Sequence, residues 1–326
     1  MLNSSDVDLL MKLNTISIQF NRYFSIFIFL FGSVGNLLNC LVLSQPSLRS
    51  NPCVFYFLIS SIANMISICS GLTTRILSGW DMDYTDTNVY MCKIRAFFMF
   101  VSRSVAFWLI ALAAADRYLS SSHLYHRRQL SSLENAQHGT IFVIIFSLLI
   151  YCQILYCYDI NIISAPLHCY GKTVICRLTT DLTYGIITIA CPLLIMFVCG
   201  LLTIRNVRNQ YDAASGRKHL IDVNYSATKR TLSYQYRRRK RINRYLCHVL
   251  FVQIVFLVVL TTPQAIEKFY TTLTIYQIKS DLHVAINNFI YNFALLLTYL
   301  ASGMTFYIYT LSGGNTFRNA LFDLFK

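Results

Sequence analysis

Seven apolar stretches alternate with polar segments along this chain of 326 residues. Each stretch has about 20 residues or more, the length that an α-helix needs to cross the roughly 30 Å hydrocarbon core of a bilayer. We therefore expect an all-α fold, a seven-transmembrane helix bundle. The predicted spans lie at about 23–43, 53–77, 92–118, 140–158, 182–204, 244–269 and 285–309.

The polar segments divide the chain around this bundle. An N-terminal tail, 1–20, precedes the bundle domain, 21–310, which includes a basic loop at about 206–243. The last segment, 311–326, has apolar residues at the spacing of an amphipathic helix, so we expect a short eighth helix in the membrane interface. Its predicted apolar face consists of Phe317, Leu321, Phe322 and Phe325.

Composition supports a membrane protein. The chain is 55% hydrophobic and 13% charged, and a soluble domain of this composition would leave much apolar surface in water. The net charge of +14 would suggest nucleic-acid binding in a soluble protein. Here the basic excess falls almost entirely on alternate connections, which the positive-inside rule places in the cytoplasm. We therefore expect an extracellular N-terminus, a cytoplasmic C-terminus and no nucleic-acid partner.

The sequence contains no pattern typical of an enzyme. It lacks a P-loop, HExxH, GxSxG and a glycine-rich dinucleotide turn. Its eleven cysteines include no CxxC pair, which argues against a zinc or redox site. We expect neither catalysis nor a bound metal nor a cofactor.

The third predicted span joins two features with different chemistry. It begins at Cys92, which can form a disulfide only in an oxidising compartment, and it ends at Asp116-Arg117-Tyr118. Cys92 therefore faces outside and Arg117 faces the cytoplasm. A third span of this kind, in a chain with six others, resembles the rhodopsin-like (class A) G-protein-coupled receptors over nearly the whole chain, with a neuropeptide-receptor-like character.

The resemblance implies a transducer end that contacts a heterotrimeric G protein. Its expected residues are Asp116, Arg117, Tyr118 and Tyr309, the last being the tyrosine retained from the family's Asn-Pro-x-x-Tyr motif. Many family members lock the arginine to an acid on the sixth helix, but here Asn243 offers only a hydrogen bond. The basic run 237–241 nearby has two compatible readings, a G-protein contact and a solvated flank that touches anionic membrane lipids.

The resemblance also implies a disulfide and a set of switch positions. Cys92 is expected to bond the second outer loop, with Cys169 as first choice and Cys176 as the alternative, and Gly171-Lys172 could turn a short hairpin there. The implied switch positions are Asn36, Asn64, Pro192, Thr261 and Pro263. Asn64 and Thr261 replace the family's usual aspartate and tryptophan, so the chain is a divergent member.

Buried arginines indicate a ligand pocket. Arg103 precedes Arg117 by fourteen residues, close to whole helical turns, so both face the bundle. Arg75 follows Asn64 by eleven residues and shares its inward face. A charge inside a membrane must pair with protein or ligand, so Arg103 either binds ligand or forms an internal pair with an acid such as Glu267 or faces a water-filled cavity. The predicted pocket comprises Arg75, Met99, Arg103, Gln264, Glu267, Tyr291, Asn292 and Tyr299, although each of the polar and aromatic residues alone is also consistent with helix packing.

These features predict a receptor in the plasma membrane. We expect an extracellular ligand, a small peptide with a carboxylate or amidated end, to activate a heterotrimeric G protein. Met99 stands where amine receptors carry an aspartate, which disfavours a monoamine. The alternatives are a lipid or odorant-like ligand and, in a different class, a seven-helix channel or transporter. Asn3, in the sequon Asn3-Ser4-Ser5, is a predicted glycosylation site.

Overall fold

The structure, a computed structural model, describes the backbone of residues 4–46, 48–80, 82–83, 85, 87–122, 124–160, 169–218, 228–274, 277, 280–312 and 314–324. Side chains are described over the same ranges except at 4–7, 209–218, 228–248, 311–316, 319 and 323. The predicted glycosylation site Asn3, the side chain of Asn243 and the whole of Phe325 lie outside the described residues.

Over the described residues the elements are helices, with a small two-stranded hairpin after α6. They are α1 Ser4–Leu43, α2 Pro52–Ser78, α3 Val89–Ser121, α4 Tyr125–Gln129, α5 Leu133–Tyr151, α6 Ile154–Cys157, β1 Tyr158–Asp159, β2 Tyr170–Gly171, α7 Val174–Leu182, the π-helix η1 Thr183–Ala190, α8 Cys191–Lys218, α9 Thr228–Leu273, α10 Asp281–Gly303, α11 Thr305–Ser312 and α12 Gly314–Leu324.

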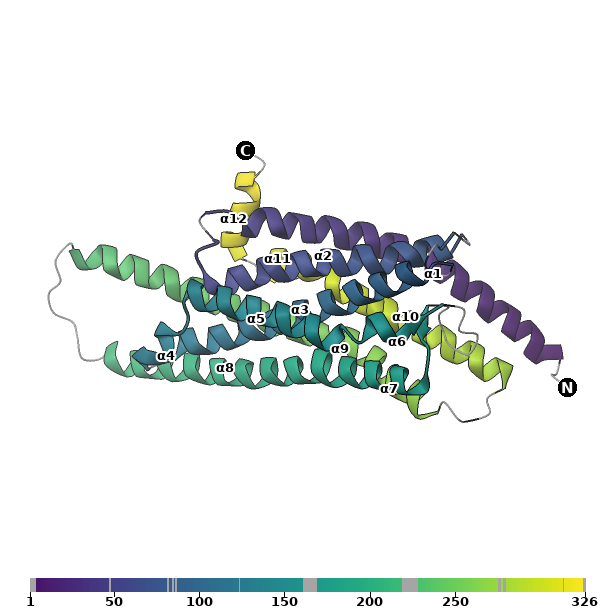
Figure 1. Cartoon of the computed structure of the whole chain (residues 1–326). Coiled ribbons are helices and arrows are strands. Elements are labelled where there is room, and N and C mark those ends of the chain that lie inside the picture. Colours follow the sequence, from purple (N-terminus) through teal and green to yellow (C-terminus); the bar gives the residue numbers. More distant parts are fainter. Residues whose placement is uncertain are drawn as a thin grey trace.

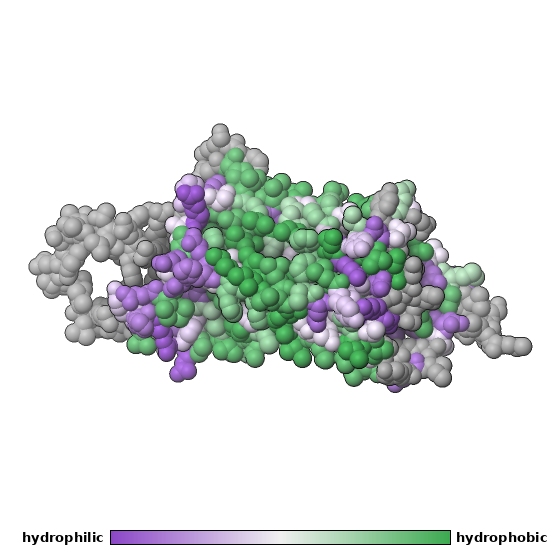
Figure 2. All heavy atoms as spheres, in the orientation of Figure 1, coloured by the Kyte–Doolittle hydropathy of each residue, from purple (hydrophilic) through white to green (hydrophobic). Residues whose placement is uncertain are grey.

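Within the described residues, seven helical segments are long and apolar enough to cross a membrane. They lie side by side along one direction (Figure 1), and an apolar belt separates two polar ends (Figure 2). This confirms the predicted all-α, seven-span bundle. The segments are Asp8–Leu43, Pro52–Ser78, Val89–Ser121, Leu133–Cys157, Val174–Arg208, Val249–Leu273 and Asp281–Gly303.

Local sequence fixes several helix starts. Asn51 caps α2 by accepting from the Cys53 N–H, and Pro52 occupies the first helical position, where its missing N–H costs nothing. The Asn88 side chain caps α3 in the same way. Asparagine and proline at these positions explain why the second and third helices begin close to the predicted residues.

Other helix limits differ from prediction. α1 begins at Ser4, so most of the expected 1–20 tail is helical, and its first turns carry an Asp8–Lys12 ion pair at helical spacing. α8 and α9 extend deep into the expected loop at 206–243. Hydropathy reports only the apolar length of a helix, and polar residues can continue it into water. The seventh span is interrupted at Met304, before α11, and α12 then turns across the bundle direction (Figure 1).

Helix α3 lies at the centre of the bundle. In its most apolar window 72% of the residues are buried, against 28–56% in the other six spans. Small residues such as Ala106, Ala113 and Ala114 form much of its buried surface and permit close helix approach. Side chains near either end of α3 therefore reach several neighbouring helices.

The fifth span contains a π-helix that ends just before Pro192. The Cys191 N–H donates to the Ile186 carbonyl, five residues earlier. Pro192 has no N–H to continue this pattern, and the Ile187 carbonyl instead accepts from the Trp108 indole of α3 at 3.1 Å. Because Pro192 cannot donate to the Ile187 carbonyl, this carbonyl is bonded to α3 and not within its own helix.

The hairpin forms in a different register from the one expected. β1 pairs antiparallel with β2, so Gly171 lies opposite Tyr158 and not in the turn. The Gly171-Lys172 turn is therefore wrong. Thr173 caps α7 through the Cys176 N–H, which commits this stretch to start a helix.

Candidate functional site

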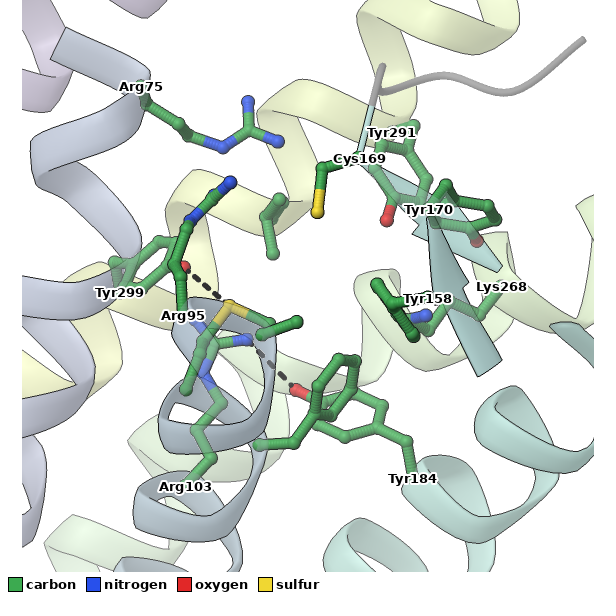
Figure 3. A pocket seen from close by; sticks show the side chains of 14 residues that line it. Arg75, Arg95, Arg103, Tyr158, Cys169, Tyr170, Tyr184, Lys268, Tyr291 and Tyr299 are labelled. Atoms are coloured by element: carbon green, nitrogen blue, oxygen red, sulfur yellow. Dashed lines mark hydrogen bonds between the residues drawn. The ribbon is translucent and has the colours of Figure 1, made fainter. Parts of the chain in front are cut away.

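A cavity of about 40 Å³ lies among the helices near the Cys92 end of α3. Figure 3 shows basic and aromatic side chains around it, from α2, α3, α9, α10 and the hairpin. Of its fourteen described lining residues, four are basic, five are tyrosines and none is acidic. The lining consists of Arg75, Arg95, Ala96, Met99, Phe100, Arg103, Tyr158, Cys169, Tyr170, Tyr184, Lys268, Tyr291, Leu295 and Tyr299.

Arg103 is held by aromatic residues, not by Glu267. Its Nη1 donates to the Tyr184 hydroxyl at 3.2 Å, and its guanidinium carbon lies 4.2 Å from the centre of the Tyr299 ring. The side chain is only 2% exposed. Cation–π contacts of this kind stabilise a desolvated guanidinium without neutralising its charge. Among the described residues the internal ion pair considered from the sequence is therefore not formed, and the charge of Arg103 is not neutralised by an acid.

Arg75 is held by amide oxygens. Its Nη1 donates to Asn292 Oδ1 at 2.8 Å and more weakly to Asn21 Oδ1 at 3.4 Å. The adjacent Arg95 donates from Nε to the Ser70 carbonyl and from Nη1 to Thr85 Oγ1, both at 3.2 Å. Uncharged acceptors thus fix both guanidinium groups at the cavity wall.

Lys268 and Asp181 form a buried ion pair that sequence reasoning missed. Lys268 Nζ bonds Asp181 Oδ1, and Thr272 Oγ1 donates to Asp181 Oδ2 at 2.8 Å. The pair joins α9 to α7, and Lys268 Nζ lies 5.5–5.8 Å from the rings of Phe100, Tyr170 and Tyr184. Lys268 follows Gln264 by one helical turn, so both lie on the same face of the helix. This periodicity was the signal that could have predicted Lys268 in place of its neighbour Glu267.

The predicted pocket residues take different places. Met99, Tyr291 and Tyr299 line the cavity with Arg75 and Arg103. Three others are outside the lining. Asn292 positions Arg75, Glu267 accepts from Thr271 Oγ1 at 3.4 Å, and Gln264 is fully buried with no described partner for either amide atom.

Two tyrosines of the hairpin cover the cavity. Burial raises the pKa of Tyr158 and of Tyr170 well above the usual value of a phenol. Both hydroxyls are therefore protonated at neutral pH, and neither supplies a negative charge to the arginines.

Two disulfides hold the hairpin at this end of the bundle. Cys92 is bonded to Cys169, the first choice from the sequence, with the Cα atoms 5.7 Å apart. Cys176, the alternative, is instead bonded to Cys157. The second bridge was not predicted, because sequence alone does not define which cysteines come together. Together the bridges attach the hairpin to α3, α6 and α7.

At the opposite end of α3, Asp116 and Arg117 form a buried ion pair. Arg117 Nη2 lies 2.6 Å from Asp116 Oδ2 and donates to Asn51 Oδ1 at 3.0 Å. Asp116 Oδ1 also accepts from Ser131 Oγ at 2.6 Å. The neighbouring Tyr118 hydroxyl accepts from Arg127 Nη1 at 2.7 Å. This network connects α3 to the start of α2 through Asn51, to α4 through Arg127 and to the segment after α4 through Ser131.

The switch positions, and Tyr309 of the expected transducer end, make contacts within and between helices. Asn36 Nδ2 donates to the Ser302 carbonyl at 3.1 Å, which links α1 to α10. Tyr309 donates to Gln253 Oε1 at 3.1 Å, which links α11 to α9. Thr261 donates to the Leu257 carbonyl within its own helix, two residues before Pro263. Asn64 is buried in α2.

Comparison with known proteins identifies the family. The model of the 7 transmembrane receptor (rhodopsin family) matches residues 35–309. A curated relative, the neuromedin U receptor homolog nmur-2 of Caenorhabditis elegans, is 23% identical over 141 residues, which is 43% of this chain and 34% of that protein. The match thus spans about a third of the relative's length. Because the family match runs from the last part of α1 into α11, the chain belongs to the rhodopsin family of seven-transmembrane receptors, and it is a multi-pass membrane receptor without enzymatic activity.

Proposed function

We propose that this receptor binds an extracellular small peptide in the cavity at the Cys92 end and activates a heterotrimeric G protein at the Arg117 end. The single observation that carries the proposal is the buried basic cavity. Four cationic side chains line it and no acid does, among the described residues. Buried charges in a membrane bundle require a partner, and a ligand supplies it.

Two further observations support a peptide. The curated relative is named as a neuromedin U receptor homolog. The hairpin fixed by two disulfides presents backbone and tyrosine side chains beside the cavity. The cavity, at about 40 Å³, admits the end of a chain and not a whole peptide, so the rest of the ligand would contact the hairpin and the helix ends.

Signalling follows from a shift between two helix arrangements. A ligand that binds one arrangement more tightly shifts the equilibrium toward that arrangement, and the ratio of the two affinities sets how far it can shift. The arrangement that we propose to be active releases Arg117 from Asp116 and exposes this end to the G protein. The proposed location is the plasma membrane, with the N-terminus outside and the C-terminus in the cytoplasm, and the distribution of basic residues supports this orientation.

The test is a peptide-library screen on cells that express the receptor with a promiscuous G protein. Responding peptides are then applied to Arg103→Ala and to Lys12→Ala, an exposed lysine in α1 used as control. Loss of a charge-assisted contact in Arg103→Ala is expected to raise the half-maximal concentration by about tenfold or more, with Lys12→Ala unchanged. Antibody labelling confirms equal surface amounts.

Unchanged potency of the responding peptides on Arg103→Ala would contradict the proposed site. A response to a lipid or odorant-like pool alone would favour that class of ligand. Ionic current across the membrane without a G protein would favour a channel or transporter.

A further inference from the structure

Arginine recognises a carboxylate through a defined edge of its guanidinium group. The Nε–H and one N–H of Nη2 point in parallel from the same side, and together they match the two oxygens of a carboxylate. Nη1 lies on the other side of the group. Which nitrogens of an arginine are already bonded therefore determines what it can still bind.

Arg75 and Arg103 have the same pattern of bonded and unbonded nitrogens. In each residue the described hydrogen bonds use Nη1, to Asn292 and Asn21 for Arg75 and to Tyr184 for Arg103. In each residue Nε and Nη2 are buried without a hydrogen-bond partner among the described residues. Both arginines therefore keep the whole Nε/Nη2 edge unpaired while Nη1 fixes their orientation.

No described residue of the cavity wall neutralises these two edges. The residues are 6% and 2% exposed, so water replaces the lost hydrogen bonds poorly. Asp181, which pairs with the lining residue Lys268, is already bonded to Lys268 and Thr272. Arg95 adds a third positive charge beside Arg75 (Figure 3). The missing partner is therefore an anion with two acceptor oxygens.

We propose that the ligand carries a free carboxylate, and that this carboxylate binds the Nε/Nη2 edges of Arg103 and Arg75. The inference rests on the proposed function, because it assumes that this cavity is the ligand site. It also decides between the two peptide ends considered above. An amidated end offers one acceptor oxygen and directs an NH₂ donor at donors, so it leaves one N–H of each edge unpaired.

Two sources can supply this chemistry, the C-terminus of a peptide and a small organic acid. The probes are therefore a pool of short peptides with free C-termini, the same pool with C-terminal amides, sodium succinate, and succinamide at matched ionic strength. Thermal unfolding of the purified full-length receptor reports binding without any G protein.

The expected result is that a carboxylate probe raises the melting temperature of the wild-type receptor more than its amide counterpart. In Arg103→Lys the positive charge remains but the two-pronged edge is lost, so about tenfold more of the carboxylate is needed for the same shift. Arg75→Lys should behave alike. Arg128→Lys in α4 is the matched control, since Arg128 is exposed and outside the cavity lining, and it should retain the preference for acid over amide.

The proposal is overturned if no carboxylate probe stabilises the wild-type receptor more than its amide, or if Arg103→Lys and Arg75→Lys both respond as the wild type does. A shift with the acid peptide pool identifies a peptide end as the source, and a shift with succinate alone identifies a small acid. Nucleotide exchange on a G protein is measured in parallel. If acids stabilise the receptor but cause no nucleotide exchange, the proposed G-protein signalling is wrong and the carboxylate site stands. If amidated peptides drive nucleotide exchange as well as acids do, the proposed carboxylate recognition is wrong and the signalling proposal stands.

Discussion

At the scale of single residues, the position of Arg103 depends on Gly71, which has no side chain and leaves room for Tyr299. Tyr299 supplies the ring beneath Arg103, and its hydroxyl donates to Met99 Sδ at 3.1 Å. That hydroxyl occupies the space where Gly71 of α2 has no Cβ, because a Cβ there would lie 1.8 Å from Tyr299 Oη. Gly71 is therefore required by close packing against the cavity wall.

We predict that Gly71→Ala displaces Tyr299 and lowers the melting temperature of the purified receptor. Overpacking of a buried site typically costs about 1–3 kcal/mol, and Arg103 loses its ring contact as well. The control is Gly200→Ala in α8, where an added Cβ meets no atom within 4 Å, and its melting temperature should not fall. Equal melting temperatures for Gly71→Ala and wild type would show that Tyr299 moves at no cost.

At the scale of elements, α9 is tied to its neighbours at two points, one on each side of Pro263. Lys268 binds Asp181 of α7 at the cavity end, and Gln253 binds Tyr309 of α11 toward the other end. Pro263 lies between these contacts, at a position where the helix lacks one backbone hydrogen bond. We therefore expect that ligand binding in the cavity can move the part of α9 after Pro263 relative to the part before it, if the Lys268–Asp181 ion pair breaks.

We predict that Asp181→Asn destabilises the receptor by about 3–5 kcal/mol, because Lys268 then keeps a buried charge without its counter-ion. The double variant Asp181→Asn/Lys268→Gln removes both charges and should recover part of this loss. Melting temperatures of the two single variants and the double variant give the coupling energy. If the double variant is destabilised by the sum of the single effects, the two side chains are not coupled.

At the scale of the whole molecule, the two ends differ in charge and in covalent structure. The Cys92 end has two disulfides, which persist in an oxidising compartment. The opposite end receives the basic connections and the Asp116–Arg117 pair. Both features favour the proposed orientation in the membrane, with the cavity outside and Arg117 inside.

This orientation predicts that an N-terminal epitope tag is labelled on intact cells and that a C-terminal tag is labelled only after permeabilisation. Glycosidase treatment should increase the gel mobility of the wild type and leave Asn3→Gln unchanged, because Asn3 would face the lumenal enzymes. Cells permeabilised from the start control for tag access. Labelling of the C-terminal tag on intact cells would show that the receptor has the opposite orientation, and the cavity would then not face an extracellular ligand.

The sequence by itself determined the features that depend on local chemistry. Span length and hydropathy predicted the seven helices, because a bilayer imposes the same length on each of them. Helical periodicity placed Arg75 and Arg103 on inward faces, since 3.6 residues per turn hold in any helix. Helix limits in water were predicted less well, at α1, α8 and α9, because there hydropathy no longer constrains the chain.

Only the tertiary structure decided which distant groups meet. Several contacts join residues that the sequence does not relate. They are the Cys157–Cys176 bridge, the Lys268–Asp181 ion pair, the pairing of the two hairpin strands, and the hydrogen bonds from Nη1 of Arg75 and of Arg103. Such contacts depend on how helices pack and rotate against one another, and no local pattern encodes that arrangement. The charge of the cavity followed from the sequence, whereas the unpaired edges that give it chemical selectivity followed from packing.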